Sequence, residues 1–102
     1  MERFTEFSRE MKKIFFEAIS TGDLETVLMF LEAGIDPNIQ IYQGWCPIHY
    51  AVYDNQLAIA HLLLDVGANP NIKNDWRRTP LFFAEYRNNE EMSQLLRRYV
   101  AN

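Results

Sequence analysis

The stretch that decides the fold reads LLLDVGANPNI and occupies residues 62–72. A related stretch, FLEAGIDPNI, occupies residues 30–39, and the two align when the chain is shifted by 33 residues. At this offset residues 10–42 and 43–75 share seven identical pairs, which are Ala18/Ala51, Leu24/Leu57, Leu31/Leu64, Gly34/Gly67, Pro37/Pro70, Asn38/Asn71 and Ile39/Ile72. Self-similarity at a fixed period of this length indicates a repeat protein.

A third unit follows at the same offset. Residues 43–69 and 76–102 share Pro47/Pro80, Ala51/Ala84, Tyr53/Tyr86, Asn55/Asn88, Leu62/Leu95, Leu63/Leu96 and Asn69/Asn102. We therefore predict one domain over residues 1–102, with repeats at 10–42 and 43–75, a capping repeat at 76–102 and a helical extension at 1–9.

Each unit is predicted to contain two short helices and a loop. In the middle unit Pro47 suits the first turn of a helix over residues 47–55, and a second helix over 56–66 ends at Gly67. The stretch 68–79 lacks helical periodicity and predicts an extended loop. Residues that tolerate a left-handed backbone are expected to end the first helices, namely Gly22, Asn55 and Asn88. Such a helix pair cannot bury its apolar face alone, so the units must stack.

The pattern resembles the ankyrin repeat family over nearly the whole chain. The family's Thr-Pro-Leu-His-x-Ala start corresponds to CPIHYA at 46–51 and TPLFFA at 79–84, and its Leu-Leu-Leu-x-x-Gly-Ala-x-x-Asn end corresponds to residues 62–71. The first unit lacks the Thr-Pro start, and the last carries charges after Leu96, as end units require because one face has no neighbour. The resemblance implies an all-α solenoid of stacked helix-turn-helix units with extended loops.

An apolar stripe over residues 1–21 begins before the first unit and runs into it. Its residues recur at spacings of three and four, which predicts one helix that covers the first unit, and they are Phe4, Phe7, Met11, Ile14 and Ala18. A second docking surface or a dimer seam is the alternative, which we consider less well supported because the stripe continues into the core of the repeat.

Composition excludes several classes. The 102 residues suffice for one core, and 48% hydrophobic and 24% charged residues are typical of a folded domain. A net charge of −4 argues against nucleic acid binding. The single cysteine, Cys46, excludes an internal disulfide, and the sequence has no apolar run long enough for a signal peptide or membrane span. We therefore expect a cytoplasmic protein, and we expect a monomer rather than an oligomer.

No catalytic or metal site is predicted, and no cofactor. Cys46 and His49 lie one helical turn apart, as a nucleophile and base could, but no third orienting group is evident. By resemblance, His49 takes the family's structural position, in which the ring hydrogen-bonds backbone between loops. His61 is expected to be partly exposed on the second helix, and two ligands do not complete a metal site.

The predicted loop tips are unusually aromatic and carry the candidate site. Trp, Tyr and Arg are enriched among binding hot spots, and ankyrin repeats typically bind partners with their loop tips and the exposed side of each first helix. This points to Tyr42, Gln43, Trp45, Tyr53, Asp54, Asp75, Trp76, Arg78, Tyr86 and Arg87 as partner-binding residues. The alternative is that Trp45 and Trp76 fold back and pack the loops against each other. This alternative stays open for one of the two tryptophans.

Charge is also unevenly distributed. Seven acidic and no basic residues lie between Ile14 and Ile72, whereas residues 73–102 carry six basic and four acidic side chains. Either the acidic stretch is a solvated surface, or it forms a flank for a basic partner.

The sequence thus predicts a non-catalytic module that binds another protein, in an inhibitor, immunity or adaptor role. Two alternatives remain. An aromatic and acidic pocket formed by Tyr42, Trp45, Tyr53 and Asp54 could capture a cationic or methyl-lysine peptide, or the chain could be a self-associating structural protein.

Overall fold

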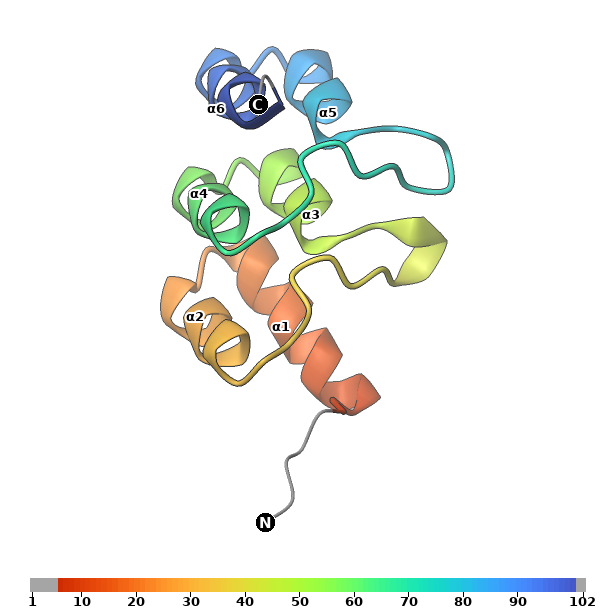
Figure 1. The fold of residues 1–102 in the computed structure, drawn as a ribbon, viewed down its shortest axis with the longest axis vertical. Helices are drawn as coiled ribbons and strands as arrows, with labels where there is room; N and C mark the ends of the chain where they lie inside the picture. Colours follow the sequence, from red (N-terminus) through yellow and green to blue (C-terminus); the bar gives the residue numbers. More distant parts are fainter. Residues whose placement is uncertain (1–5, 101–102) are drawn as a thin grey trace.

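Three helix pairs stack along the long axis of the molecule (Figure 1). The computed structural model describes residues 6–100, and this part contains no β-strand. Helices α1, α3 and α5 form one row and helices α2, α4 and α6 a second row beside it (Figure 1). Between residues 6 and 100, no helix is both long and apolar enough to cross a membrane. The elements are α1 (Arg9–Thr21), α2 (Leu24–Glu32), the 3-10 turn η1 (Tyr42–Gly44), α3 (Pro47–Tyr53), α4 (Leu57–Asp65), α5 (Pro80–Tyr86) and α6 (Glu90–Val100).

The sequence dictates where the first helix of each pair begins and ends. Pro47 and Pro80 open α3 and α5, where the missing N–H of proline costs no hydrogen bond. A residue with a left-handed backbone follows the first helix of each pair. The φ angles are 85° at Gly22 after α1, 56° at Asn55 after α3 and 57° at Asn88 after α5. The prediction that these three residues end the first helices is therefore confirmed.

Hydrogen bonds between units accompany the apolar stacking. The Gln56 side-chain amide donates to the Ser20 carbonyl at 3.0 Å, between the first and second units. One repeat later, the Asn89 amide donates to Asn55 Oδ1 at 2.5 Å. A continuous core runs through all three units, and its fully buried members include Phe15, Ile19, Ile48, Ile59, Leu63, Met92 and Leu96. Each unit is thus stabilised by its neighbours, as expected for a solenoid.

Two tight loops project away from the helices at the edge of the α1, α3, α5 row (Figure 1), and we call them the first finger (residues 41–45) and the second finger (residues 74–78). The second finger lies on the first, because the Asp75 N–H donates to the Gln43 carbonyl at 3.0 Å. Gly44 has a φ of 76°, and a Cβ atom there would lie 2.6 Å from Asp75 Oδ1. Glycine is therefore required where the fingers meet.

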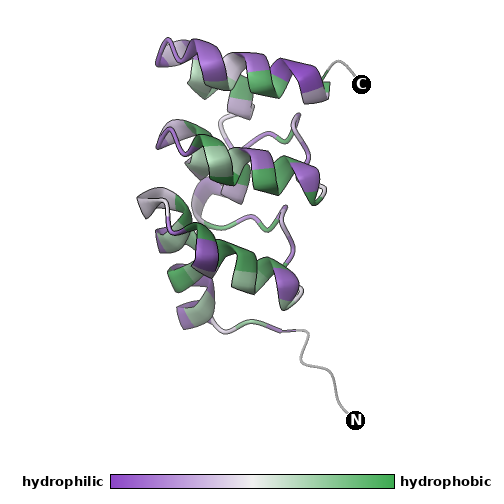
Figure 2. Ribbon diagram, turned by 90° about the vertical axis from the view of Figure 1, so that its left-hand side faces the viewer, coloured by the Kyte–Doolittle hydropathy of each residue, from purple (hydrophilic) through white to green (hydrophobic). Residues whose placement is uncertain are grey.

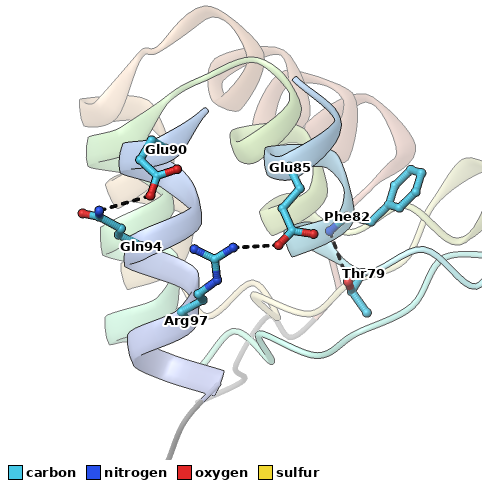
Figure 3. A network of polar contacts seen from close by, with 6 residues as sticks. All are labelled: Thr79, Phe82, Glu85, Glu90, Gln94 and Arg97. Carbon is cyan, nitrogen blue, oxygen red and sulfur yellow. Dashed lines mark hydrogen bonds and ion pairs between the residues drawn. The ribbon is translucent and has the colours of Figure 1, made fainter. Parts of the chain in front are cut away.

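The C-terminal end of the stack is polar. Figure 3 shows Arg97 of α6 reaching Glu85 of α5 at 2.7 Å, and Gln94 donating to Glu90 on α6. The Thr79 side chain accepts from the Phe82 N–H and so caps α5. Hydrophilic segments run along α6 in Figure 2. Such exposed polar contacts are stable without a further repeat packed against them.

The N-terminal stripe predicted over residues 1–21 is wrong as a single helical face. Helix α1 begins at Arg9, and the Ser8 side chain caps it by accepting from the Met11 N–H. Residues 6–8 are therefore not helical, although the sequence predicts a helical extension over residues 1–9. Phe7 packs against Phe30, with ring centroids 6.1 Å apart. Met11 and Ile14 are 44% and 51% exposed. Phe4 lies outside the described residues.

The buried face of α1 is wider than the predicted stripe. It comprises Phe15, Phe16, Ala18 and Ile19. Helix α1 packs against both α2 and α3, so its apolar residues must cover two directions at once. The four buried residues follow one another at spacings of one, two and one, so they cover a broad face that can pack against two helices. A stripe at spacings of three and four is narrower and packs against only one helix.

Candidate partner-binding groove

Six of the ten predicted site residues line a single groove with a volume of about 660 Å³. The groove lies where the first finger meets α3 and α5. We call it the aromatic groove. Its lining residues are Ser20, Tyr42, Gln43, Trp45, Tyr50, Tyr53, Asp54, Phe82, Phe83 and Tyr86. Residues that lie far apart in sequence therefore present their aromatic rings to one space, as a binding site for an apolar group requires.

Trp45 forms part of the structure of this groove. Its ring centroid lies 4.8 Å from that of Phe83, 5.0 Å from that of Tyr50 and 5.8 Å from that of Tyr53. The ring is only half-buried, so the remainder faces the groove. Trp45 thus folds back onto rings of α3 and α5, whereas the sequence alternative predicts that the tryptophans pack the loops against each other.

Two tyrosines that line the aromatic groove are far more exposed. Tyr42 on the first finger is 76% exposed, and Tyr86 at the end of α5 is 72% exposed. Exposed rings held on ordered elements offer a large contact area at small entropic cost, because tyrosine has only two side-chain torsions. These two side chains are the ones most available to a partner.

The second finger lies outside the groove and carries Asp75, Trp76 and Arg78. Trp76 is 62% exposed, and its indole Nε1–H donates to Gln43 Oε1 at 3.3 Å. The buried Asn74 shapes this finger, since its Oδ1 accepts from the Trp76 and Arg78 backbone N–H groups. Sequence analysis missed Asn74, although an asparagine that opens a tight turn is the signal that could have found it.

Two arginines flank the aromatic groove. The guanidinium of Arg78 lies 4.2 Å from the centroid of the Phe82 ring, and that of Arg87 lies 4.7 Å from the centroid of the Tyr53 ring. Both are cation–π contacts within the usual range. Arg78 and Arg87 are exposed, so they can still pair with carboxylates of a partner.

His49 has a structural role in the finger region. Its Nδ1 accepts from the Cys46 N–H and its Nε2–H donates to the Arg78 carbonyl, both at 3.0 Å. This arrangement needs the neutral ring, and burial lowers the pKa of His49 below its ordinary value of 6.5. The ring therefore joins the second unit to the second finger, as the family resemblance implied.

Cys46 is fully buried, and burial raises the pKa of its thiol to about 11. We therefore expect the folded protein to react with a thiol reagent such as a maleimide at pH 7.5 at least a hundredfold more slowly than the unfolded chain, because the thiolate is the reactive form. Mass spectrometry after timed exposure, with and without denaturant, measures this. Equal rates in the two conditions would mean that Cys46 is accessible.

His61 is exposed, as predicted, and pairs with Asp65 at 3.1 Å on the outer surface of α4. No group of three or more potential metal ligands is found among residues 6–100.

A second groove adjoins the first and has a volume of about 550 Å³. We call it the basic groove. It is lined by Arg9, Lys12, Lys13, Phe16, Glu17, Ser20, Thr21, Ile41, Tyr42 and Tyr50. Ser20, Tyr42 and Tyr50 line both grooves, so the two form one continuous surface. Sequence analysis named no partner-binding residue on α1, although the recurrence of Arg9 and Lys13 at a spacing of four could have indicated this face.

Stacked helix pairs and paired fingers together define a helical-repeat protein, in which the aromatic groove is the candidate binding surface. A model of the ankyrin repeat family, with three copies of the repeat, matches residues 15–102. The chain belongs to the ankyrin repeat family, whose repeats are generally protein–protein interaction modules. The comparison with curated proteins found no match.

Proposed function

We propose that this chain is a non-catalytic module that binds a segment of another protein in the aromatic groove. The observation that carries the proposal is the convergence of Tyr42, Trp45, Tyr53 and Tyr86 on one space of about 660 Å³. Aromatic anchors of this kind dominate binding energies at protein interfaces. The polar groups at the margin, Asp54 among them, would fix the orientation of the partner.

Rigid support is the second argument. The first finger is closed by the Ile41 N–H donating to the Trp45 carbonyl at 3.0 Å, and the second finger lies against it. Because these loops are already ordered, little conformational entropy is lost when a partner buries their side chains. We propose that binding inhibits, protects or localises the partner in the cytoplasm, that the chain acts as a monomer, and that it does not bind nucleic acid.

The methyl-lysine alternative is less well supported. Its four residues, Tyr42, Trp45, Tyr53 and Asp54, do line the same groove. However, the Arg87 guanidinium already lies 4.7 Å from the centroid of the Tyr53 ring. A second cation there would be repelled by the arginine, with only the Asp54 carboxylate to compensate. The third possibility, self-association, is tested by sedimentation at several concentrations.

Replacing both Tyr42 and Tyr86 by alanine is expected to weaken partner binding at least tenfold, in the usual range for hot-spot truncations. Both side chains are more than 70% exposed, so the fold is expected to be retained. The experiment is affinity capture from the native lysate, followed by calorimetric titration of the captured partner. Circular dichroism compares the folding of the variants.

The control is Met29→Ala, which removes an apolar side chain, 65% exposed, from α2 outside the aromatic groove. It should bind like the wild type. Binding that survives the double tyrosine substitution in a folded protein, or that is lost in Met29→Ala, would place the interface elsewhere.

A further inference from the structure

We infer that the partner is an acidic segment: its carboxylates lie against the basic groove while an apolar side chain enters the aromatic groove. This deepens the proposed function and rests on it. Sequence analysis left open an acidic flank for a basic partner, and the position of the charges in the structure points to the opposite chemistry.

Helix α1 presents a mainly basic face to the basic groove. Arg9, Lys13 and Glu17 follow one another at a spacing of four, so their side chains lie in one row along the helix. Lys12 belongs to a second row at the same groove. Three basic side chains thus stand against one acidic side chain. None of the three forms a hydrogen bond or an ion pair with another residue among residues 6–100.

The part of the continuous surface that lies away from α1 also carries basic side chains. Arg78 and Arg87 flank the aromatic groove through their ring contacts with Phe82 and Tyr53. The continuous surface is therefore basic at both ends, and Asp54 is the acidic residue that lines its aromatic part. A partner that spans the surface meets positive charge before and after the aromatic rings.

The rest of the molecule carries the opposite charge to the two grooves. The chain has a net charge of −4, and seven acidic residues lie between Ile14 and Ile72. Of these seven, Glu17 and Asp54 line the two grooves. The other five lie outside them, and they are Asp23, Glu25, Glu32, Asp36 and Asp65. Basic groups gathered at a groove in an otherwise acidic molecule attract an acidic segment to that groove and orient it.

The apolar lining limits the partner further. Phe16, Ile41 and Tyr50 line the basic groove together with the charged side chains. A polymer of carboxylates alone would leave this area unfilled. An extended peptide in which acidic residues are interspersed with aromatic or aliphatic residues matches both features, because the apolar groups are buried while the carboxylates reach the lysines and arginines.

A random 12-residue peptide library displayed on phage tests the inference with the full chain as bait. We expect the enriched pool to contain Asp and Glu at about twice their frequency in the starting library, together with at least one aromatic or large aliphatic residue per peptide. The most enriched peptide is then synthesised with a fluorescent label and its affinity is measured by anisotropy at low and high salt.

Arg9→Gln/Lys13→Gln removes two charges from the basic groove and keeps comparable helix propensity. Its affinity for the labelled peptide should be about tenfold lower than that of the wild type at low salt, with the difference shrinking at high salt. The matched control, Lys73→Gln/Arg77→Gln, changes the net charge equally with exposed residues that line neither groove. It should bind within about twofold of the wild type.

An enriched pool that is neutral or basic, or an affinity that falls equally in both charge variants, would overturn the acidic preference and leave groove binding intact. A pool with no enrichment would contradict the proposed function as well. Tighter binding of a labelled single-stranded oligonucleotide than of the selected peptide would show that the basic groove serves nucleic acid instead.

Discussion

His49→Ala is expected to lower the free energy of unfolding by about 3 kcal/mol or more. The ring is fully buried, so its removal leaves a cavity and two unpaired backbone groups, the Cys46 N–H and the Arg78 carbonyl. Each buried group left without its hydrogen bond costs about 1–3 kcal/mol, and the cavity adds to this. Urea unfolding followed by circular dichroism measures the change. A variant already unfolded without urea also meets the expectation.

The control for this prediction is the second histidine. His61 is 56% exposed and contacts an exposed aspartate and, edge-on, the ring of Tyr99, so His61→Ala is expected to change stability by less than about 0.5 kcal/mol. If the two variants were equally stable, His49 would not join the second unit to the second finger.

The same ring makes stability depend on pH. Unfolded His49 titrates near 6.5, and burial lowers the pKa in the folded protein. Below pH 6.5 the unfolded chain therefore binds more protons than the folded chain, and stability falls as the pH is lowered, until it passes the lowered pKa of the folded state. Urea unfolding at pH 7.5 and 5.5 should show this loss in the wild type and a smaller one in His49→Gln. Equal slopes would assign the loss to other groups.

Trp45→Ala is expected to lower the free energy of unfolding by about 2–3 kcal/mol, whereas Trp76→Ala changes it by less than about 1 kcal/mol. Trp45 is half-buried and its ring contacts those of His49, Tyr50, Tyr53 and Phe83. Trp76 is 62% exposed and donates one hydrogen bond to Gln43. Thermal unfolding measures both, since about 1 kcal/mol shifts the Tm of a domain of this size by about 4–8 °C.

This contrast matters for every binding experiment on the chain. A loss of binding in Trp45→Ala combines a missing contact with a disturbed groove, because the ring holds Phe83 and Tyr50 in place. Near-equal stability of the two tryptophan variants would instead show that Trp45 is as peripheral as Trp76.

The sequence was sufficient to predict the fold because its signals are local and periodic. Prolines open α3 and α5, and Gly22, Asn55 and Asn88 adopt the left-handed backbone that ends the first helices. The N-terminal stripe failed for a physical reason. Spacing in one helix predicts an apolar line, but not how many neighbouring helices that line must cover.

The candidate site was only partly predictable. The repeat period places Tyr53 and Tyr86 at equivalent positions in α3 and α5, and Tyr42 lies on the first finger just before α3, so the three rings line one groove. Sequence could not tell that Trp45 packs inward and Trp76 points outward, because that depends on how the fingers close. The spacing of Arg9 and Lys13 indicates a basic row on α1, but only the fold places that row beside the first finger, where both residues line one groove with Tyr42.

The most direct test of the central claim is site-specific photo-crosslinking. A photoreactive phenylalanine analogue is placed singly at Tyr42, at Tyr86 and, as a control, at Met29. Each position is more than 60% exposed, so the substitutions should not disturb the fold. We predict that the partner crosslinks to positions 42 and 86 and not to position 29. Crosslinking at position 29 without crosslinking at 42 and 86 would contradict binding in the aromatic groove.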